Sequence, residues 1–67
     1  MNNIQSFVRE RFGRERPTLP ESVYKESLRI PKIRFGRILR NEQQPTIDEL
    51  QRVGEWLGVD PKQLINF

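Results

Sequence analysis

The chain has 67 residues, with 12 basic and 9 acidic side chains, no cysteine and no histidine, which gives a formal charge of +3 at pH 7. This length allows one small domain, residues 1–67, which buries only about 60% of the surface that its unfolded form exposes. Disulfides and zinc held by Cys or His are excluded, and no apolar run approaches the roughly 18 residues of a membrane helix, so we expect a cytoplasmic protein.

Apolar residues recur with helical rather than alternating spacing along the whole chain. The first predicted helix, residues 3–12, ends at Gly13, and its apolar stripe consists of Ile4, Phe7, Val8 and Phe12. The second begins near Thr18, which has capping-box spacing with Glu21, and Pro31 interrupts it. Its buried face consists of Val23, Tyr24 and Leu28.

The later elements have clearer boundaries. The third predicted helix, residues 31–40, has Phe35, Ile38 and Leu39 pointing inward, and Asn41 can adopt the left-handed conformation that ends a helix. The fourth starts with a capping box, Thr46 and Glu49. Its apolar face consists of Ile47, Leu50, Val53 and Leu57, with Trp56 off this stripe and partly buried against the last helix. That last helix has Asp60 as its N-cap.

Positive charge is concentrated in one quarter of the chain. Between Lys25 and Arg40 six basic residues stand against one acid, a net charge of +5, whereas residues 41–67 carry −3. A helix face that meets only solvent usually interleaves acids with bases. The segment therefore has the electrostatic footprint of a site that meets nucleic acid.

Little in the sequence points to catalysis. Histidine and cysteine are absent, and the serines have no evident base partner. The four glycines are widely separated, so a phosphate-binding glycine-rich loop is missing. We therefore predict a protein that is not an enzyme and has no cofactor, metal or small-molecule substrate.

The helices on either side of Ile30 have the arrangement of a helix-turn-helix, over about residues 19–40. Two short helices are joined by a tight break, and the second is strongly basic. Such a helix needs an apolar side to anchor it and an opposite side of donors that can enter the major groove. The side chains that lie away from the anchor are Lys32, Ile33 and Arg37, with Arg34 near the edge.

From Leu19 to Ile65 the chain resembles the Cro/cI-type (Xre-like) helix-turn-helix domain of phage and plasmid regulators. The strongest part is RILRNEQQPTIDELQRVGEWLGVDPKQL, which is similar to that family's end of the recognition helix, proline-containing loop and final two helices. The resemblance implies an all-α, lambda-repressor-like bundle of about five short helices. The family commonly has a glycine where Arg29 falls and a small residue where Lys25 falls, so this turn is where the chain departs from it.

Carried over by position, the resemblance implies that residues 31–40 are the recognition helix. The residues expected to contact bases are Lys32, Ile33, Arg34 and Arg37. The residues expected to contact phosphate are Ser22, Arg29, Arg40, Asn41, Gln43, Gln44 and Thr46. Arginine and lysine favour guanine edges, and isoleucine can contact a thymine methyl group.

The sequence thus predicts sequence-specific binding of double-stranded DNA by a repressor-like transcriptional regulator of phage, plasmid or mobile-element type. Because one small domain has a small footprint, we expect a homodimer on a two-fold operator. The alternative is a protein-interaction module of the same fold, an antitoxin or anti-regulator whose basic helix meets an acidic protein. Binding of structured RNA is a third possibility.

Overall fold

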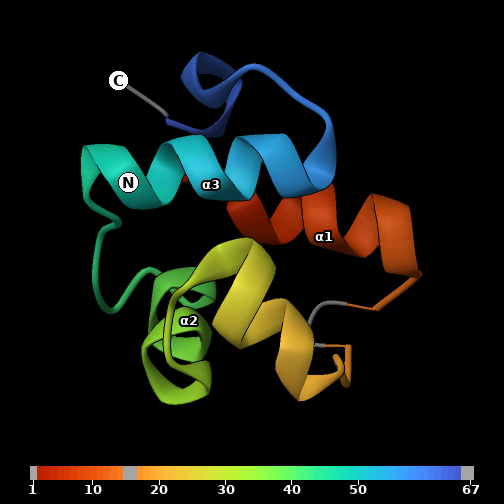
Figure 1. Cartoon of the computed structure of the whole chain (residues 1–67). Helices are drawn as coiled ribbons and strands as arrows, with labels where there is room; N and C mark the ends of the chain where they lie inside the picture. Colours follow the sequence, from red (N-terminus) through yellow and green to blue (C-terminus); the bar gives the residue numbers. More distant parts are fainter. Residues whose placement is uncertain (1, 15–16, 66–67) are drawn as a thin grey trace.

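The computed structural model describes residues 2–14 and 17–65, and helices dominate this part of the chain (Figure 1). The elements in chain order are α1 (Ile4–Phe12), η1 (Val23–Leu28), α2 (Lys32–Leu39), α3 (Ile47–Leu57) and η2 (Pro61–Leu64). The strand-like feature among the described residues is an isolated antiparallel bridge between Asn2 and Ile65. The all-α prediction is confirmed, and no described helix is long and apolar enough to cross a membrane.

The five helical segments lie close to the predicted positions, but they are not all α-helices. In the described part of the chain α1, α2 and α3 are α-helical, whereas η1 is π-helical and η2 is a single 3₁₀ turn. Pro31 stops η1 after six residues, and η2 has only four. Against the predicted bundle of about five short helices, the described residues form three α-helices, one π-helical segment and one 3₁₀ turn.

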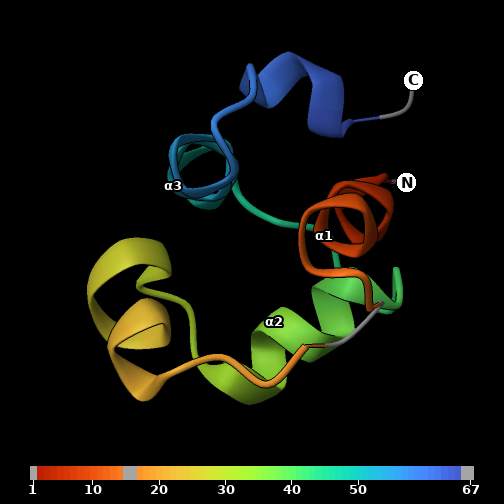
Figure 2. The same ribbon diagram turned by 90° about the vertical axis from the view of Figure 1, so that its right-hand side faces the viewer.

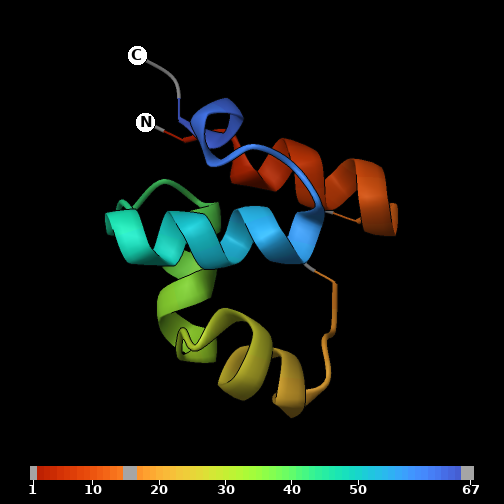
Figure 3. The same cartoon turned by 45° about the horizontal axis from the view of Figure 1, so that its top comes forward.

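α1 and α3 lie side by side in the middle of the molecule, as Figures 1 and 2 show from two directions. η1 and α2 form a layer on one side of this pair, and η2 lies on the other side. Figure 3 shows α3 crossing over α2. α3 contacts η1, η2 and α1, so it is the central element that joins the two sides.

Each of the five helical segments contributes at least one side chain to the hydrophobic core. The buried apolar residues are Ile4, Val8, Leu28, Ile30, Phe35, Ile38, Leu39, Val53, Leu57 and Leu64. The predicted inward face of α2 is confirmed, since Phe35, Ile38 and Leu39 are at most 4% exposed. The prediction for Ile47 is wrong, because it is 76% exposed. Ile47 is the first residue of α3, and its side chain faces solvent there.

Trp56 is partly buried, as predicted, and its aromatic neighbours come from α1 and α2. Its ring stacks on Phe12 at a centroid distance of 5.4 Å and meets the edge of Phe35 at 6.0 Å. These aromatic contacts tie the three α-helices together. They also leave Phe12, at 37% exposure, only partly covered.

Most of the predicted helix boundaries are confirmed. Thr46 and Glu49 form the capping box of α3, and Asp60 caps η2 by accepting a hydrogen bond from the Lys62 backbone. The capping box predicted at Thr18 is wrong, because residues 17–20 are irregular and helical hydrogen bonding begins at residue 21. Pro20 holds the residue before it in extended backbone, so a helix cannot start earlier.

η1 ends in a left-handed turn at Arg29, whose φ is +53°. The backbone N–H of Ile30 donates to the Tyr24 carbonyl over 3.1 Å, which closes the turn and lets Ile30 enter the core. Lys25 points outward, with its ammonium group 3.8 Å from Glu21. The π-helical segment and the strained turn therefore lie at Lys25 and Arg29, where the sequence resembles Cro/cI-type domains least.

Because residues other than glycine pay about 1 kcal/mol or more for left-handed backbone, we expect Arg29→Gly to raise the free energy of unfolding by about 1 kcal/mol. Asn41→Gly is the matched control, since Asn41 also has a positive φ, of +61°. Its side chain hydrogen-bonds Asn2, so this control should destabilise the protein. Urea denaturation measures both, and a loss of stability in Arg29→Gly would contradict the assignment of strain.

Candidate nucleic-acid interface

One face of α2 is packed into the core, and the opposite face presents Lys32, Ile33 and Arg37 to solvent. Ile33 is 74% exposed and shares this face with the two cations. Neither the Lys32 ammonium group nor the Arg37 guanidinium group has a hydrogen-bonding or ion-pair partner among the described residues. The structure thus brings together three of the four predicted base-contacting residues.

Arg34, the fourth, turns toward α3 instead. Its Nε and Nη2 donate to the two carboxylate oxygens of Glu49 over 2.9 and 2.7 Å, and Nη1 donates to Gln43 Oε1 over 2.7 Å. The Glu49 carboxylate also accepts the Thr46 backbone N–H at 2.8 Å. Because bidentate arginine–carboxylate pairs are geometrically demanding, this contact holds the beginning of α2 against the beginning of α3.

Glu49 is 8% exposed and has a strongly shifted pKa. The hydrogen bonds from Arg34 lower its pKa from 4.5 to about 2, aided by the Thr46 backbone N–H, whereas burial acts in the opposite direction. The same pair raises the pKa of Arg34 above its ordinary value. Both groups are therefore ionised at neutral pH, and the Arg34 guanidinium group is held in an ion pair with Glu49.

The loop that follows α2 is held by Asn2, a residue that the sequence analysis did not identify. The Asn2 backbone N–H donates to Asn41 Oδ1 over 2.8 Å, and Asn41 Nδ2 donates back to the Asn2 carbonyl over 3.1 Å. The buried Asn2 side chain donates to the Ile38 carbonyl and to Gln44 Oε1, each over 3.1 Å. No local pattern signals these contacts, because they join residues about forty positions apart.

The other predicted phosphate-contacting residues divide into two groups. In the loop, Arg40 pairs with Glu42, Gln43 accepts from Arg34, and the Thr46 hydroxyl caps α3. Ser22 and Arg29 are exposed and lie at the two ends of η1. The loop side chains therefore make hydrogen bonds within the fold, whereas the side chains of Ser22 and Arg29 make none of these bonds.

Arg29 and Lys32 share a hollow of about 450 Å³ between η1 and the start of α2, which we call the basic hollow. It is lined by Glu21, Tyr24, Lys25, Arg29, Ile30, Pro31 and Lys32. Three of these side chains are cationic and one is acidic. Cations grouped in a concave surface attract anions more strongly than isolated cations do.

The chain matches no protein-family model, no curated protein and no solved structure. The likeness to Cro/cI-type domains therefore rests on the residues quoted for it. The features of the structure that bear on function are the exposed face of α2 and the basic hollow beside it.

Proposed function

We propose that this protein binds double-stranded DNA sequence-specifically, as a small repressor-like transcriptional regulator with α2 in the major groove. The observation that carries the proposal is the exposed face of α2, where Ile33 is 74% exposed and the cations of Lys32 and Arg37 have no hydrogen-bonding or ion-pair partner among the described residues. A helix of about 10–12 Å diameter fits a major groove about 12 Å wide. Its two cations offer donors to guanine, and Ile33 offers an apolar contact to a thymine methyl group.

In this proposal η1, the turn at residues 29–31 and α2 act as the helix-turn-helix. Ser22, Arg29 and the cations of the basic hollow contact phosphate, and most of the affinity comes from neutralising phosphate charge. Arg34 has a different role from the one expected from the sequence, since its pairing with Glu49 supports α2 rather than reading a base. The loop network around Asn41 likewise fixes the angle at which α2 is presented.

A single domain of this size covers little DNA, so we propose that two copies bind a two-fold operator. The exposed α2 face also supports a second candidate, binding to an acidic protein. Ile33 at 74% exposure, flanked by cations, would suit an acidic peptide with an apolar side chain. We propose no catalytic role for either case.

The test is fluorescence anisotropy with random-sequence duplex DNA over a range of salt concentrations. We expect tight binding at low salt that weakens linearly on a log–log plot. Arg37→Ala should weaken binding by about tenfold and reduce the salt slope by about one, and adding Lys32→Ala should weaken it further. Selection from a random DNA pool would then reveal the operator and its symmetry.

Lys62→Ala is the matched control, because it removes one positive charge from η2, on the far side of α3 from α2 (Figure 1). It should change affinity far less than Arg37→Ala does. Equal effects of the two variants would mean that net charge, and not the α2 face, governs binding. If the wild-type protein fails to bind duplex DNA at low salt, the acidic-protein proposal replaces the DNA proposal.

A further inference from the structure

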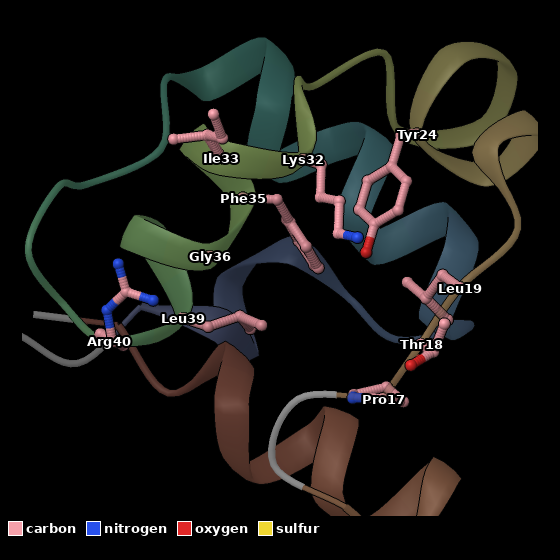
Figure 4. A pocket seen from close by; sticks show the side chains of 10 residues that line it. All are labelled: Pro17, Thr18, Leu19, Tyr24, Lys32, Ile33, Phe35, Gly36, Leu39 and Arg40. Atoms are coloured by element: carbon pink, nitrogen blue, oxygen red, sulfur yellow. The ribbon is translucent and has the colours of Figure 1, made fainter.

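A second concave surface lies on the other side of Lys32, and we call it the apolar hollow (Figure 4). It has a volume of about 390 Å³ and lies between α2, Tyr24 of η1 and the irregular segment 17–19. Its lining consists of Pro17, Thr18, Leu19, Tyr24, Lys32, Ile33, Phe35, Gly36, Leu39 and Arg40. Its size and mostly apolar lining are those of small-molecule sites.

Polar groups enter this hollow at one end. In Figure 4 the Lys32 ammonium group and the Tyr24 hydroxyl group project into the same part of the hollow. Neither has a hydrogen-bonding partner among the described residues. Burial raises the pKa of Tyr24 above its ordinary value of 10.0, so the phenol is neutral at physiological pH and can donate. An ammonium and a neutral phenol together offer charge-assisted hydrogen bonds to an anion.

The floor of the hollow depends on Gly36. Glycine in the middle of a helix is less favourable than alanine, so Gly36 lowers the stability of α2. It also leaves this part of the hollow without a side chain. A Cβ atom added at Gly36 would meet only the flexible Arg40 guanidinium, with Nη1 at 3.4 Å. The space above this glycine is therefore limited by the movable end of the Arg40 side chain. It is bordered by the Phe35 and Tyr24 rings, whose centroids are 6.1 Å apart.

We propose that the apolar hollow binds a small aromatic carboxylate. The ring lies over Gly36 between the apolar side chains, and the carboxylate accepts hydrogen bonds from Lys32 and Tyr24. Charge complementarity selects an acid, because the described residues supply Lys32 with no counter-ion. The partly exposed Tyr24 ring favours a flat ring over a flexible chain, since stacked and edge contacts add to apolar burial.

This site has a regulatory consequence that rests on the proposed DNA binding. Lys32 and Ile33 belong both to the lining of the hollow and to the exposed face of α2. A bound carboxylate neutralises Lys32 and holds it away from DNA. The acid is therefore an effector that lowers affinity for DNA without any change of fold.

Isothermal titration calorimetry with naphthalene-2-carboxylate and naphthalene-2-carboxamide tests the site without DNA. We expect the acid to bind at least about tenfold more tightly than the amide, from the charge-assisted hydrogen bonds. Lys32→Met should abolish this preference, whereas Lys62→Met should retain it. Gly36→Leu should weaken both ligands by about tenfold or more by filling the floor, and its fold can be verified by circular dichroism.

Equal affinities for acid and amide in the wild-type protein, or unchanged binding in Gly36→Leu, would overturn the proposed site. A third measurement adds naphthalene-2-carboxylate to the DNA complex, with sodium acetate as the control for ionic strength. The acid should lower DNA affinity in the wild-type protein and not in Gly36→Leu. If the protein binds the acid but not DNA, the DNA proposal fails and the ligand site stands, so the two failures are distinguishable.

Discussion

Replacing Glu49 with glutamine should lower the free energy of unfolding by about 3 kcal/mol at neutral pH. Glu49 has a pKa of about 2 in the folded protein instead of 4.5, and each unit of difference corresponds to about 1.4 kcal/mol. Glutamine keeps the shape of the side chain but loses the charge that binds Arg34. For a domain of this size such a loss is a large fraction of the total stability.

The effect has a defined dependence on pH. Because folding lowers the pKa of Glu49, its stabilising contribution is fully present above about pH 5 and is lost as pH falls from 4.5 toward 2. The wild-type protein should therefore lose more stability than Glu49→Gln across this window, and the two should converge in acid. Urea titrations at several pH values, followed by the fluorescence of Trp56, measure both curves.

Glu55→Gln is the control, because it removes a carboxylate from the same helix at an exposed position. Its stability should follow that of the wild-type protein at every pH. If Glu49→Gln and the wild-type protein were to lose stability in parallel between pH 5 and pH 2, the Arg34–Glu49 pair would not supply the stabilisation assigned to it.

Features encoded by neighbouring residues could be predicted from the sequence. The inward face of α2 follows from the spacing of Phe35, Ile38 and Leu39, and the capping box of α3 follows from Thr46 and Glu49. The same helical geometry that turns those three side chains inward turns Ile33 and Arg37 outward. The exposed face of α2 was therefore predictable together with the core.

Features that depend on distant residues could not be predicted. Arg34 and Glu49 are fifteen positions apart, so no helical spacing distinguishes Arg34 from a surface arginine. Asn2 reaches Asn41 only because α1 packs beside the end of α2. The apolar hollow likewise requires the segment 17–19 to lie across α2. In each case the signal is tertiary, and the sequence supplies only the residue types.

Gly54→Ala should lower the free energy of unfolding by about 2–3 kcal/mol, although alanine is the better helix former. Gly54 is buried in α3, and a Cβ atom there would lie 2.9 Å from the Val59 carbonyl oxygen and 3.0 Å from Pro61 Cγ. The Val59 backbone N–H donates to the Gly54 carbonyl at 2.9 Å, which holds the turn close to the helix. Relieving the clash would break this contact and move η2.

Gly36→Ala provides the opposite result in the same protein. Gly36 is also inside a helix, but a Cβ there would meet only the flexible end of the Arg40 side chain, at 3.4 Å, which can move aside. Alanine should therefore stabilise the protein by about 0.5–1 kcal/mol. Thermal denaturation of the two variants separates helix propensity, which favours alanine at both sites, from packing, which opposes it at only one. If Gly54→Ala were also stabilising, the turn at Val59 and Pro61 could not pack against α3 as described.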